Sequence, residues 1–172
     1  MKNIKKIAKF LRKSNFYDKA CVLFEVPDDI KKIVCNIANS IPKEKINIDA
    51  GGIDDQSHVT VLYGVNDDID LQKYFSEPLR VRTDDKVTYF DNDSFSVAKI
   101  KVFCNDLEKI HHTMKESEPN EHKYDYSPHI TIAYLNKGER LDNDNISKSE
   151  WQQNHVALQR NGLINKHVLQ SN

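Results

Sequence analysis

One short motif occurs twice in this chain, and its repetition constrains the fold more than any other feature. Residues 58–63 read HVTVLY and residues 129–134 read HITIAY. The two copies share a histidine, a threonine and a tyrosine, and the other three positions are apolar in both. Each copy is rich in β-forming residues, which predicts two strands. His129 follows His58 by 71 residues, so we expect an internal duplication of about half a domain and an α+β fold.

Alternation along a strand divides each copy into two chemically different faces. Residues i and i+2 point the same way, so His58 and Thr60 share one face of their strand, and His129 and Thr131 share one face of theirs. The apolar residues between them point toward a core. If the duplicated halves pack symmetrically, the two imidazoles face each other across a cleft.

Two facing imidazoles suit the cleavage of a phosphodiester. A neutral imidazole accepts a proton from the nucleophile, and a protonated one gives a proton to the leaving oxygen. Histidine suits both tasks because its unperturbed pKa is about 6.5. Threonine hydroxyls can hydrogen-bond the non-bridging oxygens, where charge gathers in the transition state. We therefore predict His58, Thr60, His129 and Thr131 as the catalytic residues, acting without a metal or cofactor, and leave open which histidine is the base.

The rest of the pattern predicts a single domain spanning residues 1–172. Two strand–helix–strand units are expected, each ending in one copy of the motif. The expected strands are 20–26, 46–48, 58–63, 79–83, 86–90, 95–103 and 129–134, and the main helices follow at 28–41 and 106–117. Residues 1–14 have the spacing of a short amphipathic helix. A hairpin over about 152–169 turns at residues 161 and 162, which read NG.

Composition excludes several function classes. The formal net charge is −1, so no strongly basic footprint for long nucleic acid is present, and a phosphate-bearing ligand must be held by a local site. No stretch reaches the roughly 18 apolar residues of a membrane span. The three cysteines do not have metal-binding spacing, which favours reduced thiols in a cytoplasmic protein. We expect Cys21 to lie in the core.

Aromatic side chains supply the candidates for stacking on nucleobases. Tyr17 and Trp151 lie in polar segments outside the motif strands, and Tyr126 precedes the second motif closely enough to close the cleft. We predict these three as substrate-binding residues. By strict alternation Tyr63 and Tyr134 face the core side, unless their strands bulge.

Other polar residues have simpler interpretations. We expect His111 and His112 to be exposed helix residues and not zinc ligands. Asp54 and Asp55 fit an ordinary solvated loop better than a metal site. Two basic residues, Lys137 and Arg140, follow the second motif and could either meet a phosphate or be solvated charges.

The paired motifs resemble those of the 2H phosphoesterase superfamily, over residues 20–135. This resemblance implies duplicated βαβ-like lobes with antiparallel-rich sheets around a central cleft. It also implies that His58 and His129 are the acid/base pair and that Thr60 and Thr131 bind the phosphate.

Two longer segments, 48–64 and 126–134, resemble the phage anti-CBASS phosphodiesterases. The resemblance implies a metal-independent enzyme that cleaves 3′–5′ bonds of cyclic di- or trinucleotide second messengers, in the host bacterial cytoplasm if the chain is phage-encoded. We expect an adjacent 2′-hydroxyl to attack, which predicts a 2′,3′-cyclic phosphate. Two alternatives stay open: an enzyme acting on 2′,3′-cyclic phosphates at RNA ends, and a non-catalytic sponge for cyclic nucleotides.

Overall fold

Residues 19–160 and 163–170 are described by a computed structural model, which has one antiparallel sheet of eight strands. The predicted mixture of helices with an antiparallel sheet is confirmed. The strand order is β6-β3-β4-β5-β2-β1-β7-β8. The strands are β1 (Ala20–Glu25), β2 (His58–Val65), β3 (Leu79–Asp91), β4 (Phe95–Phe103), β5 (His129–Asn136), β6 (Glu150–Gln153), β7 (His155–Arg160) and β8 (Leu163–Val168). The helices are α2 (Asp28–Ser40) and α3 (Asn105–Ser117), with 3-10 turns at Lys43–Lys45 and Leu71–Lys73.

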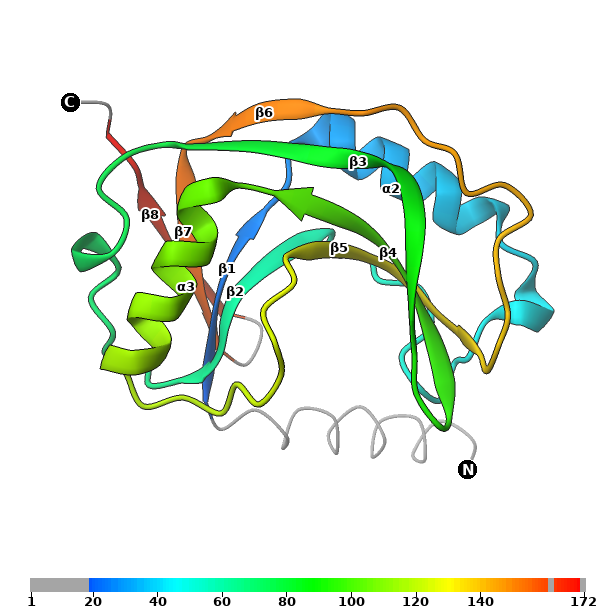
Figure 1. The fold of residues 1–172 in the computed structure, drawn as a ribbon, viewed down its shortest axis with the longest axis horizontal. Coiled ribbons are helices and arrows are strands. Elements are labelled where there is room, and N and C mark those ends of the chain that lie inside the picture. The colour runs from blue at the N-terminus through cyan, green and yellow to red at the C-terminus, as the bar shows by residue number, and fades with distance from the viewer. Residues whose placement is uncertain (1–18, 161–162, 171–172) are drawn as a thin grey trace.

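The sheet is curled into an arch, with the two helices on its outer side (Figure 1). Helix α2 packs against β5 and helix α3 against β2. Each helix therefore covers the motif strand that lies on the other half of the sheet, and this cross-packing ties the halves together. In the described part of the chain, no helix is long and apolar enough to cross a membrane.

The two halves meet where β2 pairs with β5. Val59 lies opposite Ile130 in antiparallel register, and neither side chain is exposed to solvent; we call these two residues the central pair. Beyond this point the loop before β2 takes over as partner of β5. The amide of Asn47 donates to the carbonyl of Tyr134 at 2.9 Å, and the amide of Asp54 donates to that of Ile132 at 3.0 Å. The backbone groups of β5 thus stay paired while β2 diverges from it.

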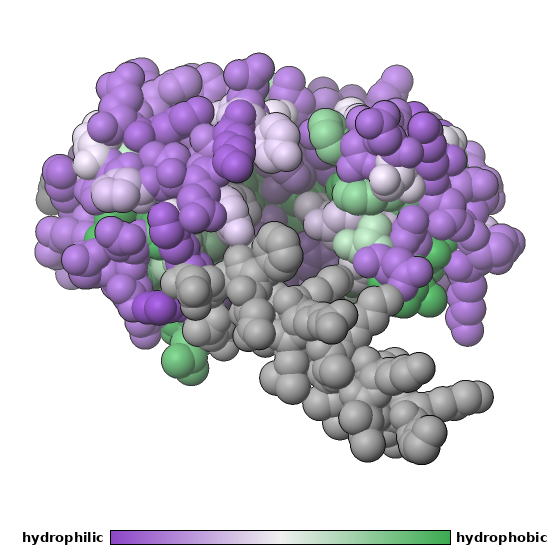
Figure 2. Space-filling model, turned by 90° about the horizontal axis from the view of Figure 1, so that it is seen from below, coloured by the Kyte–Doolittle hydropathy of each residue, from purple (hydrophilic) through white to green (hydrophobic). Residues whose placement is uncertain are grey.

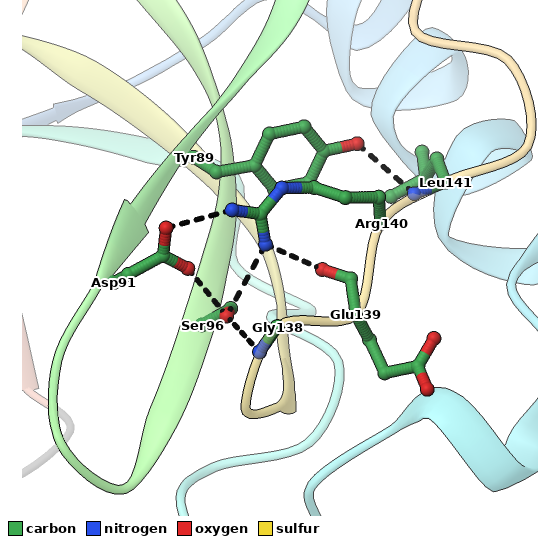
Figure 3. A network of polar contacts seen from close by, with 7 residues as sticks. All are labelled: Tyr89, Asp91, Ser96, Gly138, Glu139, Arg140 and Leu141. Carbon is green, nitrogen blue, oxygen red and sulfur yellow. Dashed lines mark hydrogen bonds and ion pairs between the residues drawn. The ribbon is translucent and has the colours of Figure 1, made fainter.

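A polar network holds the β3–β4 hairpin to the turn that follows β5 (Figure 3). The guanidinium of Arg140 lies over the ring of Tyr89, 4.4 Å from its centroid, and donates to Asp91 at 2.7 Å. The hydroxyl of Ser96 donates to Asp91 and accepts from the amide of Gly138. These contacts fix the end of the hairpin that forms one leg of the arch. They also resolve the open question about Arg140, which is engaged in an ion pair within the fold.

Strand β3 differs from its prediction. The sequence predicts two strands separated by residues 84 and 85, whereas β3 continues through them with a register irregularity between Thr83 and Val87. A second segment keeps this stretch extended, because the amide of Val87 donates to the carbonyl of Asp144 at 2.8 Å and the amide of Ile146 to that of Asp85 at 2.9 Å. The strand expected at 46–48 is reduced to a single bridge at Ile46.

Two other predictions have different outcomes. Strands β7 and β8 pair antiparallel in the region where a terminal hairpin is expected. The helix expected at 1–14 lies outside the described residues. Because the two halves form one continuous sheet, the duplication into two lobes stays a prediction.

The central pair should dominate stability. Replacing Ile130 with Ala removes buried methyl groups at the junction of the halves, and we expect the free energy of unfolding to fall by about 2–5 kcal/mol. Ile130→Val should cost only about 0.5–1.5 kcal/mol. Urea denaturation followed by circular dichroism measures both. Equal costs for the two variants would show that this position is not tightly packed.

Candidate active site

The four predicted catalytic side chains lie together on one face of β2 and β5. Continuing the register of the central pair by one residue in each direction places Thr60 opposite His129 and His58 opposite Thr131. All four are partly buried, whereas the residues between them are fully buried on the other face. The two histidines are therefore diagonal neighbours, with Cα atoms about 7–8 Å apart. This spacing leaves room for one phosphate between the imidazoles.

The motif face looks into the arch, since both helices pack on the opposite, apolar face. Figure 2 shows the molecule from the open side of the arch. Hydrophilic side chains form a rim on either side of a hollow, and apolar groups lie deeper within it.

His129 is held in one orientation by the backbone. Its Nδ1 lies 2.7 Å from the carbonyl oxygen of Ser127. A carbonyl only accepts, so Nδ1 carries the hydrogen and Nε2 keeps a lone pair in the neutral ring. Burial lowers the pKa of His129, and the positive charges of Lys99 and His58 lower it further, whereas the hydrogen bond to Ser127 and the charge of Asp54 raise it by less. The site thus favours a neutral, oriented imidazole, which is the form a general base needs.

His58 has a different environment. Its Nδ1 is buried and has no hydrogen-bond partner among the described residues. On β1 the residue opposite His58 is Glu25. The carboxylate of Glu25 forms an ion pair with the ammonium of Lys166 at 2.8 Å. The two histidines are therefore not equivalent, because only His129 is oriented by a backbone carbonyl.

Two β-bulges redirect the motif tyrosines. The register of β2 against β1 shifts next to residues 61 and 62, and that of β5 against β4 shifts next to residues 132 and 133. In each strand the two residues are both buried, and the alternation then resumes one position later. Tyr63 and Tyr134 consequently return to the motif face. Strict alternation would turn both rings toward the core, and the bulge in each strand is what reverses this.

A buried ring stack supports the bulge in β2 from behind. The Nδ1 of His111 donates to the carbonyl of Val61 at 2.7 Å, and the hydroxyl of Tyr126 donates to that of Thr60 at 3.2 Å. The two rings are stacked, with centroids 3.9 Å apart. His111 is only 1% exposed, so the expectation of an exposed helix residue is wrong: α3 turns this side of itself toward β2. Burial lowers the pKa of His111.

The predicted substrate-binding residues do not all gather at the motif face. Tyr126 packs against His111 behind β2, so its contact with substrate stays a prediction. Trp151 lies on β6, three strands away from β5, and its indole donates to Gln153 at 2.9 Å. Tyr17 lies outside the described residues.

Residues to which the sequence assigns no catalytic role also lie at this face. The thiol of Cys21 is 4.0 Å from the hydroxyl of Thr60, and burial raises the pKa of the thiol to about 11. Its apolar run led to the expectation of a core position. On β4, Lys99 lies opposite Thr131 of β5, and Lys101 lies opposite His129. The alternating pattern of residues 95–103 puts both lysines on the polar face of their strand. This pattern is the sequence signal that could have identified them.

The loop before β2 has a structural role. A Cβ atom on Gly51 would lie 2.6 Å from the ring of Tyr134, so only glycine allows this close approach. Asp54 accepts from the amide of Gln56 at 2.9 Å. Within residues 19–160 and 163–170, no group of three or more His, Cys, Asp and Glu side chains is placed to hold a metal ion.

Comparison with known proteins identifies the family. A family model described as "Anti-CBASS protein Acb1" matches residues 37–161, well over half of the chain. The chain belongs to the anti-CBASS protein Acb1 family. No curated protein matches the sequence significantly.

Two solved structures resemble the fold at low sequence identity. TT0787 of Thermus thermophilus has a TM-score of 0.53 at 13% identity, with 88% of this chain and 94% of that chain covered. Usb1 of Kluyveromyces marxianus has a TM-score of 0.51 at 7% identity, with 87% and 97% covered. At these identities the two likenesses concern the fold alone.

The buried His111 should make stability depend on pH. Because its pKa is lowered in the folded protein, the unfolded chain binds the proton first as the pH falls below about 6.5. The contribution of neutral His111 to the free energy of unfolding is fully present above that pH. It is lost as the pH falls toward the pKa that His111 has in the folded protein. We expect the stability gap between wild type and His111→Gln to narrow from about pH 7.5 to about pH 5. Urea denaturation at both pH values measures it, with the exposed His112→Gln as control. A constant gap would contradict this.

Proposed function

We propose that this protein is a phosphodiesterase that cleaves a 3′–5′ bond of cyclic di- or trinucleotides, without a metal, and so counters CBASS immunity. Membership of the Acb1 family supports the role against CBASS. The observation that carries the chemistry is the antiparallel register of β2 and β5, which brings both histidines and both threonines onto one face.

The proposed reaction is an internal transesterification. The Nε2 of His129 accepts the proton of a ribose 2′-hydroxyl, and the 2′-oxygen attacks the neighbouring phosphorus. The bond from phosphorus to the 5′-oxygen breaks, and His58 protonates that oxygen as it leaves. The ring of the messenger opens to a chain that ends in a 2′,3′-cyclic phosphate. The hydroxyls of Thr60 and Thr131 donate to the non-bridging oxygens as their charge grows.

The assignment of roles follows from the unequal surroundings of the histidines. A carbonyl of the backbone fixes His129 with its lone pair on Nε2, and burial together with Lys99 favours its neutral form. His58 is then the group that begins the reaction protonated. A positive charge on His58 lowers the pKa of His129 and so favours the neutral form of that ring.

Loss of either histidine should abolish cleavage. We expect His58→Ala and His129→Ala each to lower the rate with 3′,3′-cyclic GMP-AMP in EDTA by at least about 100-fold. Mass spectrometry identifies the products, and a transient 2′,3′-cyclic phosphate is expected. His112→Ala, at an exposed position on α3, is the matched control. Incorporation of solvent oxygen in the first step, with no cyclic species at any time, would contradict the proposed nucleophile.

The same experiment separates the alternatives. Cleavage of 2′,3′-cyclic phosphates at RNA ends, with cyclic dinucleotides left intact, would assign the enzyme to RNA ends. Recovery of intact cyclic nucleotide after denaturation of a stable complex would identify a sponge. A protein that only sequesters its ligand does not need an oriented general base. The hydrogen bond from His129 to the carbonyl of Ser127 therefore favours an enzyme.

The acid limb of the pH profile should report His129. The base must be neutral, and its pKa in the folded protein is lowered from 6.5. We therefore expect kcat/KM to rise with pH through an apparent pKa below about 6.5 and to be lost at lower pH. Stopped time points over about pH 4.5–8 measure this limb. An acid limb centred well above 6.5 would contradict the assignment of His129 as base.

A further inference from the structure

Lys99 stands out among the basic residues of the motif face because of its position. It lies opposite Thr131 across β4 and β5, one residue before Ile100, which is the neighbour of Ile130. The side chains of residues 98, 100 and 102 are buried on the apolar face. Alternation therefore turns Lys99 into the arch, beside the hydroxyl of Thr131 and the ring of His129.

The side chain of Lys99 is partly buried, and none of the described carboxylates forms an ion pair with its ammonium. The side chain is half-buried, and burial lowers the pKa of its ammonium, with Lys101 lowering it further. Among the described residues no acidic group opposes this shift. Removing a cation from water without a counter-ion raises the free energy of the folded protein. An anion that binds beside the cation offsets this desolvation cost.

Other cations near the arch do have partners. Arg140 is paired with Asp91 at 2.7 Å (Figure 3), and Lys45 with Asp142 at 2.8 Å. Lys101, two residues along the same face, is exposed and places its ammonium 5.0 Å from the centre of the Phe103 ring. Lys99 differs from these three in combining partial burial with the lack of a carboxylate among the described residues.

The charge of Lys99 already acts on the candidate base. Its positive charge lowers the pKa of His129, as does the charge of His58, whereas the charge of Asp54 raises it. A phosphate held between the two histidines would therefore lie within reach of this ammonium.

We propose that Lys99 is a substrate-binding residue that supplies the positive charge for the phosphate undergoing cleavage. This inference rests on the proposed function. The phosphate carries one negative charge in the substrate and approaches two in the pentacoordinate transition state, so the attraction to Lys99 grows during the reaction. On the other motif strand, the neighbour of Thr60 on β1 is the apolar Leu23, so this charge acts from one side only and sets the direction in which the substrate lies.

The direct test compares Lys99→Gln with Lys101→Gln. Removing the charge at position 99 should lower kcat/KM for 3′,3′-cyclic GMP-AMP by on the order of 100-fold, mainly through kcat. Lys99→Arg should recover most of the activity because it restores the charge. Lys101→Gln removes the same charge from the same face and should change kcat/KM by less than about threefold. Equal losses in the two Gln variants would overturn the proposal, because they would reflect a general field and not a contact.

The pH profile gives a second readout that a purely structural role would not move. Loss of the Lys99 charge should raise the pKa of His129, so the acid limb of kcat/KM should shift to higher pH in Lys99→Gln. It should move less in Lys101→Gln, because Lys101 is exposed and its charge is screened by solvent. His58 and Asp54, whose charges also act on the pKa of His129, are unchanged in both variants. An unmoved acid limb in Lys99→Gln would count against the proposal.

A binding measurement separates this inference from the proposed function. Inorganic phosphate is titrated into each protein while the imidazole nitrogens of His129 are followed by NMR. Phosphate should bind wild type and Lys101→Gln with similar affinity and bind Lys99→Gln at least about fivefold more weakly. If no nucleotide is cleaved but this difference appears, the proposed function fails and the anion site stands. If cleavage depends on both histidines but neither kinetics nor binding depends on Lys99, the function stands and this inference fails.

Discussion

The candidate active site depends on the pairing of Val59 with Ile130. This one fully buried contact brings the first residues of two strands side by side, although they begin 71 residues apart in the sequence. Side chains alternate between the two faces along β2 and β5. Because the apolar side chains pack beneath the helices, the histidines and threonines lie on the opposite face. The residues that make the core and the residues proposed for catalysis are thus neighbours in the same two strands, and neither set can move without the other.

The two strands then diverge, and the structure maintains the site through contacts that lie behind it. The bulge in β2 leaves the carbonyls of Thr60 and Val61 to be satisfied by Tyr126 and His111, which stack on each other. Helix α3 therefore supports the first motif through a ring stack as well as through apolar packing. On the other strand the loop before β2 pairs with β5, and a glycine at position 51 lets it pass close to Tyr134. These arrangements hold both motif strands rigid where the ligand is expected.

The sequence predicted what depends on local periodicity and missed what depends on register. The shared face of His58 and Thr60 follows from two-residue alternation, and the burial of Val59 confirms that alternation. The return of Tyr63 to the same face depends on a bulge, which is visible only once β1 lies alongside. His111 was assigned to the surface although its spacing from Leu107 and Met114, the other buried residues of α3, is helical. The sequence could not show that Lys99 lacks a carboxylate partner among the described residues, because ion pairs depend on which other strands lie beside it.

The most direct test of the central claim is a crystal structure of the protein with a phosphorothioate analogue of 3′,3′-cyclic GMP-AMP that resists cleavage. We predict that one phosphorus atom lies between the Nε2 atoms of His58 and His129, with its non-bridging atoms hydrogen-bonded by Thr60 and Thr131. A bound analogue whose phosphates lie away from both histidines would contradict the two-histidine mechanism, whatever the family of the chain.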